Sequence, residues 1–149
     1  MRIAIRGHNL PGAGFPCLSA GEVRENVHVA VQEGREPVGL VRGDARGAAW
    51  DVDVRVLETE DGLDFRGQAV HGKRGERFVY LTWGTVGDDG SFAMFRRAKL
   101  MLGRVDPALV RAADAAGTPL VAEVDLTDER GGPRCARVDP PALRWSLGQ

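Results

Sequence analysis

The chain contains few of the residues that usually build metal centres and disulfide scaffolds. It has two cysteines, Cys17 and Cys135, and three histidines, and none of these residues falls in a short metal-binding spacing. Two distant cysteines exclude a zinc site made of cysteine pairs and do not suggest a secreted, disulfide-rich protein. No apolar run approaches the ~20 residues that cross a bilayer, and the first residues lack the apolar core of a signal peptide. We therefore expect a cytoplasmic protein without a membrane segment, a metal or another cofactor.

Lysine is scarce too, because only Lys73 and Lys99 are present and arginine carries nearly all of the positive charge. Arginine suits bidentate contacts with carboxylate or phosphate, but codon bias is the stronger explanation of its abundance beside so much alanine and glycine. The formal net charge is −1, so the chain lacks the broad positive surface of most nucleic-acid-binding proteins. We expect nucleic acid not to be a partner, although a local basic patch is compatible with this composition.

Alternation of apolar and polar residues predicts about eight short strands. The clearest period-2 pattern runs from Trp50 to Val56, and Glu60-Asp-Gly-Leu then predicts a hairpin turn into residues 64–70. Residues 77–86, Arg-Phe-Val-Tyr-Leu-Thr-Trp-Gly-Thr-Val, carry apolar groups on both faces, which is typical of a central strand. Further strands are expected at residues 2–8, 25–33, 37–41, 120–127, 134–138 and 143–145.

Residues 92–102 fit either a helix or a strand, because their apolar residues satisfy both periods. We favour the strand, since Asp89-Gly90 repeats the hairpin signal and the strand before it needs a neighbour. A helix is predicted at residues 107–116, with Asp106 as its cap, Pro107 in its first turn and Gly117 at its end. The fold class is therefore mainly β (α+β): one antiparallel β-barrel-like or sandwich domain over residues 1–149, with one packed helix.

Aromatic and basic residues gather around the predicted central strand. If residues 92–102 form a strand, Arg97 and Lys99 point away from its apolar face and Arg96 points into it. A buried guanidinium without a partner costs several kcal/mol, so Arg96 requires an internal carboxylate, which is the simpler solution, or a bound anion. The leading hypothesis is a protein that binds a small, anionic molecule in a β-lined cavity. Its candidate ligand-binding residues are Trp50, Arg77, Tyr80, Trp83 and Arg96, and core packing is the competing explanation of the rings.

A small β-barrel enzyme that performs acid–base chemistry, such as a cyclase, isomerase or hydrolase, is an alternative. Its candidate residues are His8 and His28 with Asp51 or Asp53, which approach one another if the first two strands pair. Asp51, Asp53 and Asp64 are a second candidate cluster, on one face of a hairpin. A solvated polar face explains these residues more simply. No catalytic motif decides whether the protein is an enzyme.

A protein- or nucleic-acid-interaction module is the third hypothesis. It would use a basic group made of Arg96, Arg97, Lys99 and Arg104. Salt-sensitive binding to DNA or RNA would support it. A homodimer is also compatible with the sequence.

Three segments together are similar to a known family. They are Arg77-Phe-Val-Tyr-Leu-Thr-Trp-Gly84 with Met94-Phe-Arg-Arg-Ala-Lys-Leu100, Leu126-Thr-Asp-Glu-Arg-Gly-Gly-Pro-Arg-Cys135, and Asn26-Val-His-Val-Ala-Val-Gln32. The chain resembles, over most of its length, a bacterial family of domains of unknown function. This resemblance implies one complete domain, and it brings no activity, cofactor or catalytic residue with it.

Overall fold

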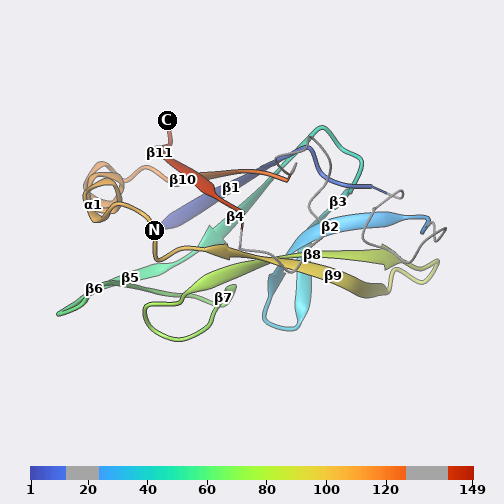
Figure 1. Ribbon diagram of the computed structural model, residues 1–149, viewed down its shortest axis with the longest axis horizontal. Coiled ribbons are helices and arrows are strands. Elements are labelled where there is room, and N and C mark those ends of the chain that lie inside the picture. The colour runs from blue at the N-terminus through green and yellow to red at the C-terminus, as the bar shows by residue number, and fades with distance from the viewer. Residues whose placement is uncertain (13–23, 127–140) are drawn as a thin grey trace.

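Two β-sheets lie on opposite sides of the hydrophobic core in a sandwich-like arrangement (Figure 1). The structure is a computed structural model that describes residues 1–12, 24–126 and 141–149. The expected strand at residues 134–138 and both cysteines lie outside these ranges. Within these ranges the predicted class, mainly β with one helix, is confirmed. Of its two forms, the described strands adopt the sandwich-like one and do not close into a barrel.

The first sheet has the strand order β11-β10-β1-β4. Its strands are β1 (Arg2–His8), β4 (Gly47–Asp53), β10 (Leu120–Asp125) and β11 (Leu143–Leu147). β1 is antiparallel to β4 but parallel to β10, so the sheet is mixed rather than purely antiparallel. Ile3 and Ile5 are buried and Arg2 and Arg6 are exposed, as the alternation in the sequence predicts.

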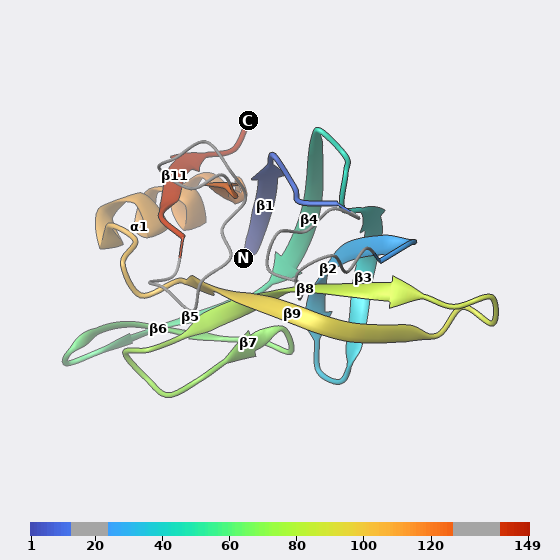
Figure 2. The same ribbon diagram turned by 45° about the vertical axis from the view of Figure 1, so that its right-hand side comes forward.

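The second sheet is centred on β8 (Phe78–Val86). β9 (Phe92–Met101) runs along the whole of β8, whereas β2 (Val27–Glu33) and β7 (Val70–His71) pair with parts of it, and β3 (Glu36–Arg42) extends the sheet beyond β2. Figure 2 shows β8 and β9 as long neighbouring strands. The central position of β8 and the strand at residues 92–101 are thus both confirmed. A strand forms there because the Asp89-Gly90 turn returns the chain along β8.

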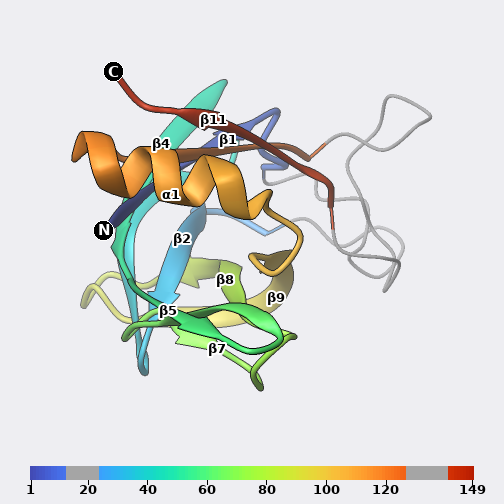
Figure 3. The same cartoon turned by 90° about the vertical axis from the view of Figure 1, so that its left-hand side faces the viewer.

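The two faces of this second sheet have different surroundings. Val79, Leu81 and Trp83 lie on the inner face and belong to the core that both sheets share. Phe78, Tyr80 and Thr82 alternate with them and lie on the outer face, which is turned away from the first sheet (Figure 3). The terms inner face and outer face refer to this sheet below.

A two-stranded hairpin made of β5 (Arg55–Thr59) and β6 (Gly62–Arg66) follows β4. The turn predicted around Glu60-Asp61 is confirmed, but the single strand predicted over residues 50–56 is divided at Val54. The Val54 N–H donates to the Met1 carbonyl at 2.9 Å, and the Val54 carbonyl accepts from the N-terminal ammonium at 3.0 Å. The chain therefore leaves the first sheet at Val54 and enters the hairpin.

Helix α1 (Pro107–Ala116) begins and ends where the sequence predicts. Asp106 Oδ1 accepts a hydrogen bond from the Ala108 N–H at 2.9 Å, and Gly117 ends the helix at φ 64°. Val110 and Ala113 are buried, and the helix lies beside β10 and β11 (Figures 2 and 3). In the described part of the chain, no helix is long and apolar enough to span a bilayer.

Candidate ligand-binding surface

The three aromatic residues predicted to line a cavity do not lie on one surface. Trp83 is on the inner face with 2% of its surface exposed, and Tyr80 is half-buried on the outer face of the same strand. Trp50, on β4 of the first sheet, is 4% exposed, and its indole N–H donates to the Gly39 carbonyl at 2.6 Å. Trp50 and Trp83 therefore pack in the core, and only Tyr80 reaches an outer surface. That the three bind a ligand stays a prediction, but they cannot do so in a single cavity.

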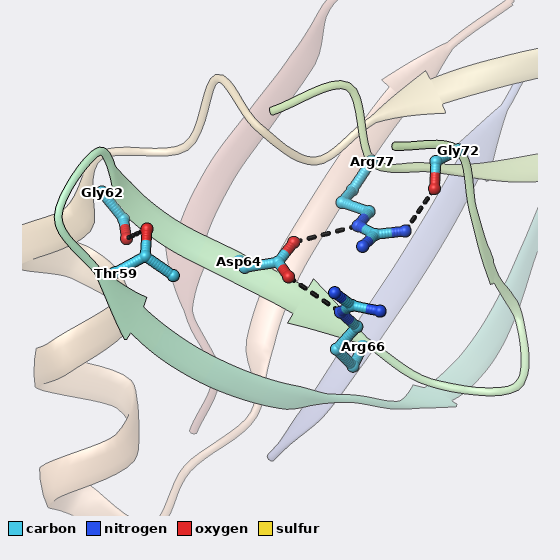
Figure 4. A network of polar contacts seen from close by, with 6 residues as sticks. All are labelled: Thr59, Gly62, Asp64, Arg66, Gly72 and Arg77. Carbon is cyan, nitrogen blue, oxygen red and sulfur yellow. Dashed lines mark hydrogen bonds and ion pairs between the residues drawn. The ribbon is translucent and has the colours of Figure 1, made fainter. Parts of the chain in front are cut away.

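Arg77 is held by Asp64, a carboxylate of the β5–β6 hairpin (Figure 4). Its Nε donates to Asp64 Oδ1 at 2.9 Å, and its Nη1 donates to the Gly72 carbonyl. Arg66 Nε donates to the other carboxylate oxygen at 2.8 Å. Asp64 is 2% exposed, so two guanidinium groups satisfy a buried negative charge. This network ties the hairpin to the segment that precedes β8.

The predicted acidic cluster does not form, because Asp51 and Asp53 are exposed on β4 while Asp64 is buried on β6. The pKa of Asp64 is lowered from its ordinary value, chiefly by the hydrogen bond from Arg77 and further by that from Arg66, against the opposing effect of burial. A carboxylate that stays ionised and fully hydrogen-bonded is suited to holding structure rather than to carrying protons.

This lowered pKa predicts acid-sensitive stability. A carboxylate with a folded-state pKa below its unfolded value stabilises the fold above pH ~4, and the stabilisation is lost as pH falls through the folded-state pKa. The stability difference between the wild type and Asp64→Asn should therefore shrink below about pH 4, as measured by urea unfolding of both proteins over a pH series. A gap that stays constant on acidification would contradict this linkage. The exposed Asp44 and Asp89, whose pKa values are also lowered, are present in both proteins and cancel.

Arg96 lies on the inner face, as the strand interpretation predicts. It pairs across the strands with Trp83, and a register shift between Trp83 and Gly84 makes Phe95 the extra residue of a β-bulge. Arg96 is half-buried, and no hydrogen bond or ion pair joins it to any residue in the described ranges. The internal carboxylate expected for this guanidinium is thus absent from the described part of the protein.

The outer face carries a cluster of rings and cations that we call the aromatic–basic face: His71, Phe78, Tyr80, Arg97 and Lys99. The ring centroids of Phe78 and Tyr80 are 4.8 Å apart, and His71 lies 5.9 and 5.0 Å from them. The Arg97 guanidinium lies 4.4 Å from the Tyr80 centroid, and Lys99 Nζ lies 4.5 Å from that of Phe78. Both distances are within the range of cation–π attraction.

The two cations lean in the same direction along the sheet. Arg97 is directly opposite Thr82 and Lys99 is opposite Tyr80, so each cation contacts the ring of the diagonal neighbour instead. Arg97 and Lys99 are exposed, and neither forms an ion pair with a carboxylate among the described residues. The strand positions on the outer face of β2, β7, β8 and β9 include no aspartate or glutamate. Among the described strand residues, the face therefore presents positive charge without a carboxylate to compensate it.

The alternation in the sequence placed Phe78 and Tyr80 on one face, but it did not predict that Arg97 and Lys99 lie over these rings or that His71 lies beside them. The parity of an antiparallel pair joined at Asp89-Gly90 could have placed Phe78, Tyr80, Arg97 and Lys99 on one face. No signal in the sequence indicates that the two-residue strand β7 brings His71 beside Phe78.

The candidate acid–base residues stay apart, because β1 and β2 belong to different sheets and do not pair. His8 Nε2 lies 3.3 Å from Glu123 Oε1 on the first sheet, and His28 Nδ1 lies 2.8 Å from the Asn26 carbonyl on the second. Within the described ranges, no group of three or more histidine, cysteine, aspartate or glutamate side chains is arranged to hold a metal ion.

Comparison with known proteins agrees with the resemblance seen in the sequence. No curated protein and no solved structure matches the chain. One family model matches residues 1–148, nearly the whole chain. The protein therefore belongs to DUF5990, a family of unknown function.

Proposed function

We propose that the protein binds an anionic ligand and that the aromatic–basic face is the binding surface. The observation that supports this most strongly is the pair Arg97 and Lys99: both are exposed, both are positioned over rings, and neither has a carboxylate partner among the described residues. Two cations on a face without acidic strand residues attract an anion and do not first have to break an internal ion pair.

The rings beneath the cations make this surface suitable for binding. Long basic side chains normally lose rotamer freedom when they bind a ligand, which opposes association. Contact with Tyr80 and Phe78 already restricts Arg97 and Lys99, so part of this cost is met in the free protein. Phe78 is 8% exposed, so packing fixes its ring and the ring holds the Lys99 side chain in a defined position.

Arg96 is the competing candidate for the anion-binding residue. The residue is half-buried and lies across from Trp83, and its guanidinium has no partner among the described residues. These features are expected of a residue that binds a small anion at the inner face. Arg96 and the pair Arg97 and Lys99 are on the same strand but on opposite faces. Substitutions of one or the other therefore show which face binds the ligand.

Titration with a short inorganic polyphosphate, followed by isothermal titration calorimetry at low salt, tests the proposed function. Arg97→Gln with Lys99→Gln should weaken binding by about tenfold, since two exposed ion pairs of about 0.7 kcal/mol each contribute about 1.4 kcal/mol together. The matched control is Arg6→Gln with Arg144→Gln, which removes the same charge from exposed positions of the first sheet and should change the affinity by less than about twofold. If the two double variants weakened binding equally, net charge alone would explain the effect and the aromatic–basic face would not be the binding surface. Absence of polyphosphate binding would refute the proposal.

A further inference from the structure

We propose that the anion bound at the aromatic–basic face is a single-stranded nucleic acid. This inference rests on the proposed function and adds the class of the ligand. It starts from a repeat: the ring of Phe78 with the cation of Lys99, and the ring of Tyr80 with the cation of Arg97, are the same unit one step further along the sheet.

The repeat suits a chain-like ligand. Residues two apart on a strand are about 7 Å apart along it, so the two ring–cation units are separated by that distance. Each unit places a planar ring beneath a positive charge, and each unit of a nucleic acid strand joins a planar base to a negative phosphate. Because Phe78 is 8% exposed, stacking of a base falls to Tyr80 and to the Arg97 guanidinium, and Lys99 contributes charge. A small anion would occupy one unit, whereas a strand engages successive units.

The aromatic character continues along the same face beyond these two units. Phe92 lies on the outer face opposite Val86, and its ring covers Gly84, where an added Cβ would lie 2.5 Å from Phe92 Cζ. Met94, on the same face, is 49% exposed. Phe78, Tyr80 and Phe92 thus follow the length of β8 and β9, with Arg97 and Lys99 beside them.

A single strand fits this surface better than a duplex. Bases in a duplex are stacked and paired, so their planar faces cannot reach rings on a sheet, whereas unpaired bases stack on aromatic side chains and on arginine guanidinium groups. The net charge of −1 argues against nucleic acid only as an average over the whole chain. The outer-face strand positions carry the opposite sign, and binding depends on this local charge.

The experiment compares three probes by fluorescence anisotropy on the full chain: an unstructured single-stranded oligonucleotide, its duplex, and a polyphosphate of matched charge used as a competitor. The single strand should bind about tenfold more tightly than either the duplex or the polyphosphate.

Variants of the face test which side chains carry this preference. Tyr80→Leu should weaken single-strand binding by about tenfold, and Tyr80→Phe, which keeps the ring, should bind like the wild type. Arg97→Gln with Lys99→Gln should reduce the slope of log affinity against log salt by about 0.7 for each cation removed.

The outcomes separate the two proposals. Equal affinity for the single strand and the polyphosphate, with no effect of Tyr80→Leu, would overturn the nucleic acid inference and leave anion binding in place. Equal or tighter binding of the duplex would also overturn the inference. Failure of all three probes to bind, or binding that Arg97→Gln with Lys99→Gln leaves unchanged, would overturn the proposed function itself. Thermal melting of each variant confirms that loss of binding is not loss of the fold.

Discussion

Asp64→Asn will lower the free energy of unfolding by about 3–5 kcal/mol, the usual cost of removing one partner from a buried ion pair. Asp64 is 2% exposed and accepts hydrogen bonds from Arg77 and Arg66. The asparagine has no charge to balance the largely buried Arg77 guanidinium, and its amide N–H groups face donors instead of acceptors. Arg66 is half exposed and water compensates it, so most of the loss arises from Arg77. Urea unfolding at neutral pH measures the change.

Asp61→Asn is the matched control for this prediction. Asp61 is on the turn of the same hairpin and pairs with Arg74 at 2.5 Å, but its side chain is 85% exposed. An exposed pair contributes at most about 1 kcal/mol, so this variant should remain close to the wild type. If both variants lost the same stability, burial would not be the source of the Asp64 effect.

Trp83→Ala will also cost about 3–5 kcal/mol of stability, as expected for a large aromatic side chain removed from a core. Trp83 is 2% exposed and packs within the core that the two sheets share. The same substitution should leave polyphosphate affinity within about twofold at a temperature where the variant is folded, because the aromatic–basic face lies on the opposite side of β8. Urea unfolding and calorimetric titration provide the two measurements.

Tyr80→Leu is the comparison for Trp83, three residues earlier on the same strand and on the outer face. It should cost less than about 1.5 kcal/mol, because a half-buried ring is replaced by another apolar side chain. A small stability loss for Trp83→Ala combined with loss of ligand binding would identify Trp83 as a ligand contact, as the sequence hypothesis had it.

Local features of the fold were predictable because short-range chemistry determines them. Asp106, Pro107 and Gly117 mark both ends of α1, and the apolar groups on both faces of residues 78–86 mark the central strand. The strand over residues 92–101 was predictable only from the Asp89-Gly90 turn before it, because the apolar pattern of these residues also fits a helix.

Features that depend on distant pairing were not predictable. The division of β4 from β5 at Val54 requires the N-terminus as a partner, and the parallel pairing of β1 with β10 joins segments from opposite ends of the chain. The bulge at Phe95 arises only when β9 is aligned with β8. Because side chains alternate along a strand, Tyr80 and Trp83, three residues apart, must lie on opposite faces. The hypothesis of a single cavity for both residues did not take this into account.

The most direct test of anion binding at the outer face compares two neighbouring residues of β9. Arg96→Gln and Arg97→Gln remove the same charge from one strand, the first from the inner face and the second from the outer face. We predict that Arg97→Gln weakens polyphosphate binding by roughly threefold, equivalent to about 0.7 kcal/mol, while Arg96→Gln leaves it unchanged. Loss of binding on Arg96→Gln, with Arg97→Gln indistinguishable from the wild type, would contradict the account and place the ligand at the inner face.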